Sequence, residues 1–180
     1  MNLIEPIYFD NALYGSFCDE IIEIFELSPG KIIRNNERYS FKELLMSNSD
    51  LLNSLQMKLI ETANEYVNLY KAQNNINHFP DIYGYEGIRI KRYDHGDEFP
   101  WHADVMDYQS ARRFLVCMFY LNDNFIGGET DFGSEENIDY TISPKQGRIV
   151  LFTPFWNNPH RGRKILNGSK YIANVYLHHL

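Results

Sequence analysis

Residues 113–132 read RFLVCMFYLNDNFIGGETDF, and this stretch decides the fold. An apolar and aromatic run, expected as a strand over 113–121, is followed by an Asn-Asp-Asn turn, and a Gly-Gly turn then precedes a second expected strand over 128–132. Further short strands separated by turn signals are expected at 86–93, 138–143, 147–153, 158–165 and 170–178. Many short strands at even spacing predict a β-sandwich or barrel.

Residues 1–80 carry mostly helical patterns instead. Ser16 is expected to cap a helix that runs to about Leu27, with an apolar face of Phe17, Ile21, Ile24 and Phe25. The capping-box pattern Ser40-Phe-Lys-Glu43 predicts a second, short helix. Apolar residues at spacings of three and four from Ser49 to about Tyr70 predict a long amphipathic helix.

Length and composition predict one mainly β domain. The 180 residues and the 44% hydrophobic share suit a single domain, with a helical bracing region in residues 1–80 and a β core in residues 81–180. The net charge of −7 argues against broad binding to nucleic acid or to an anionic membrane. Cys18 and Cys117 form no close pair, which fits a reducing compartment. With no basic leader and no run of about 18 apolar residues, a soluble cytoplasmic protein is expected.

Three side chains have the residue types of an open metal site. In Phe99-Pro-Trp-His-Ala-Asp104, His102 and Asp104 stand two residues apart, so an extended segment turns both to one side. With His160 they form a set of two imidazoles and one carboxylate, which leaves one face of an ion open and suits non-haem Fe(II). A structural zinc site is usually closed by four ligands. Taken alone, each of these three residues would be read as a structural or solvent-exposed side chain. That interpretation is the one expected for the other histidines, His78, His95, His178 and His179.

Lys170 follows His160 on the next expected strand. In a low-dielectric barrel its ammonium could pair with a ligand carboxylate, whereas an isolated lysine here would be an exposed strand residue. A two-residue Asn167-Gly168 hairpin would put His160 and Lys170 on opposite faces of the sheet. A shared site therefore predicts a three-residue loop or a bulge between these two strands.

Seven motifs together carry a family resemblance. In chain order they are Arg92-Tyr93-x-x-Gly96, His102-x-Asp104, Phe119-Tyr-Leu-Asn122, Gly127-Gly-Glu-Thr130, Gly147-Arg, Pro159-His-Arg-Gly162 and Lys170. Over roughly residues 84–178 the chain thereby resembles the prolyl 4-hydroxylase branch of the Fe(II)- and 2-oxoglutarate-dependent dioxygenases. The resemblance implies a double-stranded β-helix, or jelly roll, braced by two or three N-terminal helices.

The resemblance also implies roles for single residues. It assigns iron binding to three residues, His102, Asp104 and His160. It assigns the 2-oxoglutarate pocket to four, Lys170 and Tyr120 at the distal carboxylate and Tyr93 and Asn174 along the wall. Substrate contacts are expected from Arg113 and Tyr176, and more weakly from Arg34, Asn36 and Arg38. The lid is expected from residues 31–40 or from the loop after Asp104. The tyrosines could equally be core residues, and residues 34–38 a solvated loop.

The implied activity is hydroxylation of an unactivated C–H bond. The resemblance implies Fe(II), 2-oxoglutarate, O₂ and ascorbate as cofactors, release of succinate and CO₂, and a prolyl residue of a peptide or protein as the substrate. Free proline or another small molecule is the alternative substrate, and a catalytically silent jelly-roll binding module is the non-enzymatic alternative. Nucleic-acid demethylation is disfavoured, because that branch typically uses arginine where Lys170 stands.

Overall fold

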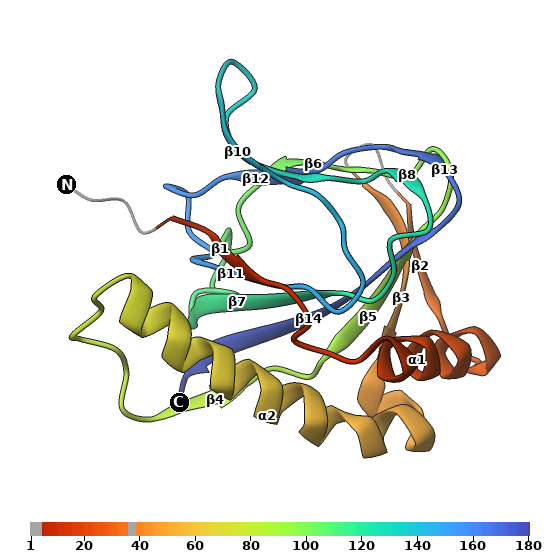
Figure 1. The fold of residues 1–180 in the computed structure, drawn as a ribbon, viewed down its shortest axis with the longest axis horizontal. Coiled ribbons are helices and arrows are strands. Elements are labelled where there is room, and N and C mark those ends of the chain that lie inside the picture. The colour runs from red at the N-terminus through yellow and green to blue at the C-terminus, as the bar shows by residue number, and fades with distance from the viewer. Residues whose placement is uncertain (1–4, 36–38) are drawn as a thin grey trace.

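Two facing antiparallel sheets form the body of the molecule (Figure 1). The computed structural model describes residues 5–35 and 39–180. The larger sheet has the strand order β1-β11-β7-β14-β5-β3-β2, and β4 pairs with β14 beside this path. Its strands are β1 (Ile7–Phe9), β2 (Ile32–Asn35), β3 (Ser40–Leu45), β4 (Tyr83–Tyr85), β5 (Arg89–Tyr93), β7 (Arg113–Tyr120), β11 (Ile149–Phe152) and β14 (Lys170–His179).

The smaller sheet has the order β10-β9-β12-β6. A buried cluster that includes Phe132 of the smaller sheet and Tyr120 of the larger one fills the space between the two sheets. The arrangement confirms the expected jelly roll. The strands of the smaller sheet are β6 (Phe99–His102), β9 (Thr130–Gly133), β10 (Ile138–Ile142) and β12 (His160–Gly162), and a separate pair is formed by β8 (Ile126–Gly127) and β13 (Ile165–Asn167).

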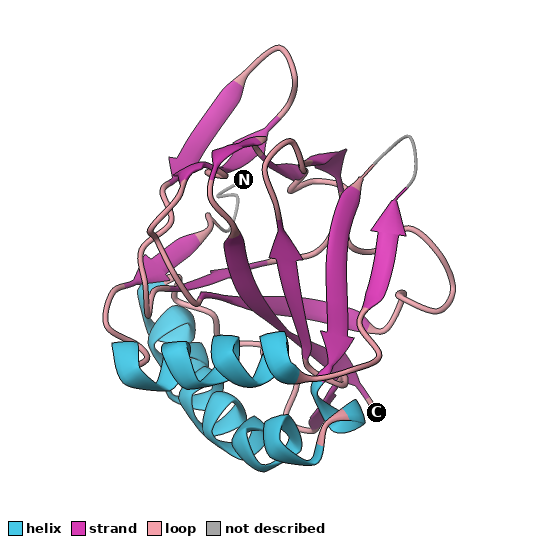
Figure 2. Ribbon diagram, turned by 90° about the vertical axis from the view of Figure 1, so that its right-hand side faces the viewer, coloured by secondary structure: helices cyan, strands magenta, loops and turns pink. Residues whose placement is uncertain are grey.

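Both α-helices cover the outer face of the larger sheet, on the side away from the smaller sheet (Figures 1 and 2). They are α1 (Gly15–Leu27) and α2 (Asp50–Gln73), and a short 3₁₀ turn, Met46–Asn48, precedes α2. Their buried side chains pack on outward-facing residues of β7, β11 and β14 in a second, larger apolar cluster. The helices thus brace the sheet from outside and leave the space between the sheets for a site.

The helix predictions were right in two cases and wrong in one. The long helix α2 forms as expected, and the Ser49 side chain caps it by accepting a bond from the backbone N–H of Leu52. Helix α1 also forms and buries Ile21 and Phe25, but its cap position is Tyr14, so the expected cap at Ser16 is wrong. The predicted helix at Ser40–Glu43 is strand β3, because pairing with β2 and β5 outweighs the local capping pattern.

The expected hairpin between the strands of His160 and Lys170 is also wrong. Strand β12 pairs with β6 and β9 in the smaller sheet, whereas β14 pairs with β4, β5 and β7 in the larger one. The chain between them forms β13, which pairs with β8. His160 and Lys170 therefore approach each other across the space between two sheets, and no odd loop or bulge is needed to put them on one face.

Two further expectations concern cysteines and membrane spans. Both cysteines, Cys18 and Cys117, are free and buried. Within residues 5–35 and 39–180, no helix has the length and apolar character needed to cross a bilayer.

Asp131 joins the strands around His160. Its side chain is fully buried on β9, where it accepts bonds from Arg161 on β12, from Arg163 and from Thr141 on β10, each at 2.8 Å. Burial alone would raise the pKa of Asp131, but the two guanidinium groups and the hydroxyl outweigh it and hold the pKa below its usual value. The carboxylate thus fixes the strand that carries His160.

We expect Asp131→Asn to lower the free energy of unfolding by about 2 kcal/mol at pH 7, because it weakens charge-assisted bonds to two arginines. The pKa of Asp131 is lowered in the folded state. The difference in unfolding free energy between wild type and variant should therefore shrink as the pH falls through that pKa. Urea unfolding measures both effects. The matched control is Glu135→Gln, at an exposed acid of the β9–β10 connection. Equal stability of Asp131→Asn and this control would contradict the assignment.

Candidate metal centre

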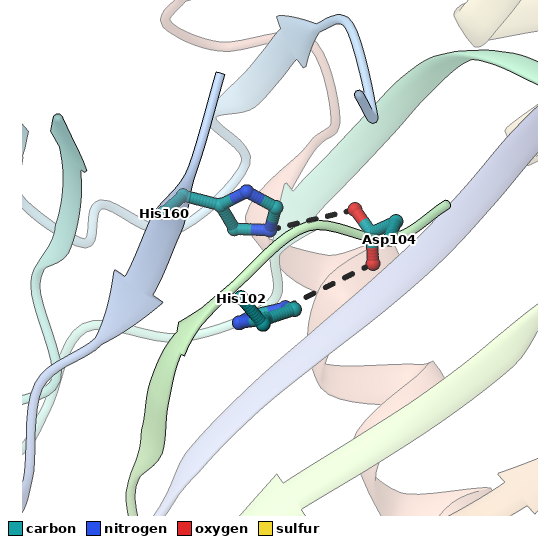
Figure 3. Close-up of side chains that lie close together, drawn as sticks. All are labelled: His102, Asp104 and His160. Carbon is teal, nitrogen blue, oxygen red and sulfur yellow. Dashed lines mark ion pairs between the residues drawn. The ribbon is translucent and has the colours of Figure 1, made fainter. Parts of the chain in front are cut away.

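Strand pairing in the smaller sheet brings together His102, Asp104 and His160. His102 ends β6, His160 begins β12, and the two residues are direct partners in the register of these strands. Asp104 lies just beyond β6, where its backbone N–H donates to the carbonyl of Pro154 at 3.0 Å. Figure 3 shows both imidazoles turned toward the same carboxylate.

The three side chains have the spacing of metal ligands. One ligand atom from each lies within 4.8 Å of the others. His160 Nε2 is 3.4 Å from Asp104 Oδ2, and His102 Nε2 is 3.9 Å from Asp104 Oδ1. Asp104 Oδ2 is buried and has no hydrogen-bond partner among the described residues. Because a buried carboxylate oxygen without a partner is costly, this atom is suited to bind a cation.

Backbone carbonyls set the tautomer of both imidazoles. His102 Nδ1 lies 2.8 Å from the carbonyl oxygen of Pro100, and His160 Nδ1 lies 3.3 Å from that of Asn158. A carbonyl can only accept, so each Nδ1 carries the proton and each Nε2 keeps its lone pair. The two Nε2 atoms point toward Asp104, which is the orientation that a metal requires.

Burial keeps the imidazoles neutral. It lowers the pKa of His102 to about 3, aided by the neighbouring His160, and it also lowers the pKa of His160 itself. For Asp104, burial would raise the pKa, but neighbouring groups, among them the Lys91 ammonium and the Tyr176 hydroxyl, outweigh it and keep the pKa below its ordinary value. Neutral imidazoles beside an ionised carboxylate are the protonation states that bind a divalent ion.

Two residues predicted to line the pocket orient Asp104. Tyr176 donates from its hydroxyl to Asp104 Oδ1 at 3.0 Å, and Asn174 donates from Nδ2 to that hydroxyl at 3.2 Å. Asn174 Oδ1 is buried without a partner among the described residues, and Asn174 lines the cavity beside the three metal-binding side chains. In this geometry Tyr176 contacts the metal-site carboxylate directly, on the side expected to face substrate.

Lys170 is buried at the opposite end of this space. Its ammonium donates to the Gly128 carbonyl at 2.6 Å and lies over the rings of Tyr120 and Tyr93, 5.1 and 5.7 Å from their centroids. Gly162 separates Lys170 from the cavity, and a Cβ added there would lie 4.0 Å from Lys170 Nζ. Because Gly162 lines the cavity and carries no side chain, the ammonium lies close behind this part of the lining, a position that suits binding of a distal carboxylate.

Of the tyrosines and the arginine predicted to contact co-substrate or substrate, Tyr93 lies at the cavity of the triad, whereas Tyr120 and Arg113 lie beside it. Tyr93 lines the cavity, whereas the Tyr120 hydroxyl bonds to Thr130 at 2.6 Å. Arg113 donates to the Asp104 carbonyl at 3.1 Å and forms an ion pair with Glu86 at 2.7 Å, at the edge of a neighbouring cavity of about 600 Å³.

The weaker substrate candidates lie further out. Arg34 is half exposed on β2 and forms an ion pair with Glu43 at 2.6 Å, so the structure does not bring it to the metal-binding side chains. Asn36 and Arg38 lie outside the described residues.

Lys91 is a cavity residue that the motifs did not indicate. It stands on β5, two residues before Tyr93, and lines the same cavity of about 40 Å³ as the three metal-binding side chains. Burial lowers its pKa, and the nearby carboxylates of Asp104 and Glu43 oppose the effect only in part. The available signal was strand alternation, which turns residues 91 and 93 to one face.

A sequence model described as the 2OG-Fe(II) oxygenase superfamily matches residues 88–178. The match covers about half of the chain and includes His102, Asp104, His160 and Lys170. A jelly roll with an open site of two histidines and one aspartate is the class that the fold and the site define. The chain belongs to the 2OG-Fe(II) oxygenase superfamily, which confirms the resemblance seen in its motifs.

Relatives with curated names include prolyl hydroxylases. A putative prolyl 4-hydroxylase of Acanthamoeba polyphaga mimivirus is 22% identical over 193 residues, covering 96% of this chain and 73% of that protein. The human 2-oxoglutarate and iron-dependent oxygenase domain-containing protein 3 is 36% identical over 86 residues, covering 44% of this chain and 25% of that protein. The chain thus matches only a quarter of the human relative.

Solved structures show the same fold. A viral collagen prolyl hydroxylase from Paramecium Bursaria Chlorella virus-1, in a 2OG complex, superposes with a TM-score of 0.67 at 22% identity, over 97% of this chain and 96% of that chain. A prolyl hydroxylase from Trichoplax adhaerens, in complex with a hypoxia inducible factor peptide fragment, superposes with a TM-score of 0.70 at 17% identity. The superposition covers 96% of this chain and 83% of that chain.

We expect His160→Ala to weaken binding of Mn²⁺ or Co²⁺ by about 100-fold or more, because removal of one of three ligands leaves an incomplete site. Titration of the purified protein, followed by tryptophan fluorescence or by the Co²⁺ absorption bands, measures the change. The matched control is His78→Ala, at an exposed histidine outside the cavity. Unchanged affinity in His160→Ala would contradict the metal assignment.

Proposed function

We propose that the protein is a prolyl hydroxylase-like enzyme that binds Fe(II) through His102, Asp104 and His160 and hydroxylates a prolyl residue in a peptide or protein. The observation that carries this proposal is the convergence of two imidazoles and one carboxylate on one point, with the buried ammonium of Lys170 close behind Gly162. The proposal treats residues 1–180 as one domain, with residues 1–80 as a bracing region and residues 81–180 as the catalytic core.

Each cavity residue has a defined task. The three ligands hold the ion on one side only, which leaves open positions for the keto acid end of 2-oxoglutarate and for O₂. Lys170 binds the far carboxylate in a low-dielectric environment, where the charge pairing is strong. Tyr120 would stand beside Lys170 at the far carboxylate, Tyr93 and Asn174 would form the wall, and Tyr176 holds Asp104 in its ligating orientation.

With iron bound, O₂ would be the oxidant and 2-oxoglutarate the co-reductant: one oxygen atom would enter succinate with release of CO₂, and the other would enter the C–H bond of the substrate. The chain supplies orientation and a dry cavity. The substrate would enter beside Asp104, where the larger neighbouring cavity carries Arg113, Arg89 and Glu86. Residues 31–40 or the loop after Asp104 would form the lid, with Arg34, Asn36 and Arg38 as the weaker substrate contacts. Ascorbate support and a cytoplasmic location remain expectations of this proposal.

The first experiment separates an enzyme from a silent jelly-roll module. Fe(II) and 2-oxoglutarate added to the protein without oxygen should give a weak visible charge-transfer band, and admission of oxygen should release succinate. Mass-shift screening of proline-containing peptides against free proline then identifies the substrate class. Absence of both the band and succinate would contradict the enzyme proposal, and a mass shift in free proline alone would favour the small-molecule alternative.

We expect Lys170→Met to weaken 2-oxoglutarate binding by about tenfold or more and to leave Mn²⁺ affinity unchanged, because it removes the ammonium from the far carboxylate but keeps the ligand triad. Calorimetric titration of 2-oxoglutarate into the Mn²⁺-loaded protein measures the loss. Lys164→Met, at a half-exposed lysine, is the control. Wild-type affinity in Lys170→Met would exclude Lys170 as the anchor.

The same lysine predicts a pH dependence. Burial lowers the pKa of Lys170 to about 7, so the free protein loses the positive charge as the pH rises through neutrality. We therefore expect the dissociation constant of 2-oxoglutarate to rise about tenfold between pH 7 and pH 8.5, with proton uptake on binding. Titrations in two buffers of different ionisation enthalpy measure both. In Lys170→Met the dissociation constant of 2-oxoglutarate should depend less on pH. The same pH dependence in wild type and variant would contradict the prediction.

A further inference from the structure

Lys91 is a largely buried residue whose ammonium lines the cavity and has no hydrogen-bond partner among the described residues. The residue is 7% exposed, and its Nζ lies 4.8 Å from the ring centroid of Phe41 and 5.5 Å from that of Phe99. Throughout the described residues, no group accepts a hydrogen bond from this ammonium. Aromatic faces compensate a buried cation only in part, so the cavity contains a strong donor that lacks an acceptor.

In a metal-loaded site, neither neighbouring carboxylate would be free to form an ion pair with the Lys91 ammonium. Its attractive neighbours are Asp104 and Glu43, while two arginines, Arg89 and Arg113, repel it. Glu43 already accepts two bonds from Arg34, at 2.6 and 2.8 Å. Asp104 is a member of the candidate metal-binding triad. A bound metal ion would neutralise part of the negative charge of Asp104, so this carboxylate would attract the Lys91 ammonium less. A largely buried cation in this position favours the binding of an anion.

Strand register places Lys91 at a defined distance from Lys170. On neighbouring strands β5 and β14, Lys91 pairs with Ile172, and Lys170 pairs with Tyr93. The two lysines are diagonal neighbours on the inner face of the sheet, an arrangement that separates Cβ atoms by about 7–8 Å. Lys170 stands at the end beyond Gly162, and Lys91 at the end of the three metal-binding side chains. Lys91 and Lys170 therefore stand on one face of the sheet, so that a short dicarboxylic acid bound between them would present one carboxylate to each.

We propose that Lys91 is a second carboxylate anchor, which binds the metal-proximal carboxylate of 2-oxoglutarate while Lys170 binds the far one. This inference rests on the proposed function. The cavity of about 40 Å³ admits an ion and one or two waters, so the co-substrate enters only when lining side chains turn aside. The flexible four-carbon stem of Lys91 can turn its ammonium onto the arriving carboxylate.

The test compares two ligands in two variants. 2-Oxoglutarate carries both carboxylates, and 2-oxopentanoate has the same keto acid end but lacks the far carboxylate. Each is titrated calorimetrically into Mn²⁺-loaded protein, with no turnover involved. Lys91→Met should weaken both ligands by the same factor of about tenfold or more, because both present the carboxylate that Lys91 binds. Lys170→Met should weaken 2-oxoglutarate but leave 2-oxopentanoate unchanged.

Controls keep the outcomes separate. Lys42→Met removes a lysine of the adjacent strand β3 that pairs with Asp94, and it should bind both ligands as the wild type does. Lys91→Arg should recover part of the affinity, which a purely structural role of the side chain would not give. Should Lys91→Met fail to fold, Lys91→Gln repeats the comparison.

Wild-type affinity for both ligands in the Lys91 variants would overturn the inference and leave the proposed function standing. Loss of 2-oxoglutarate binding alone would also overturn it, because Lys91 would then act on the far carboxylate. If the wild-type protein loaded with Mn²⁺ bound neither ligand, the proposed function itself would fail, and the inference with it.

Discussion

The pairing of β12 with β6 is the constraint on which the site depends. It sets His160 directly opposite His102 and brings both imidazoles to Asp104, which follows β6. The carbonyls of Pro100 and Asn158 then fix both tautomers so that each Nε2 lone pair is free. A shift of this register by one residue would turn one imidazole to the other face of the sheet and remove a ligand. Asp131 protects the register by joining β9, β10 and β12.

The distribution of burial explains how one sheet supports both stability and chemistry. The outer face of the larger sheet is covered by α1 and α2 and carries the apolar cluster that stabilises the fold. The inner face carries Lys91, Tyr93, Lys170 and Asn174, which are polar residues that a purely structural core would avoid. The helices therefore allow the inner face to be used for binding, because the fold does not depend on that face alone.

The sequence predicted the jelly roll and the long amphipathic helix, because each rests on a local pattern or on motifs in a fixed order. It also singled out His102, Asp104 and His160, which the structure brings together. It did not predict that Ser40–Leu45 is a strand, since partners distant in sequence decide that outcome. It placed His160 and Lys170 in one hairpin, although they belong to facing sheets. Lys91 lies outside every motif, and only the three-dimensional structure shows that its ammonium reaches the cavity.

The most direct test of the central claim is anomalous X-ray diffraction from a crystal grown with Mn²⁺ and 2-oxoglutarate. The account predicts one strong anomalous peak bonded to His102, Asp104 and His160, and 2-oxoglutarate bound between that peak and Lys170. A strong peak at another position, or 2-oxoglutarate bound away from Lys170, would contradict the account.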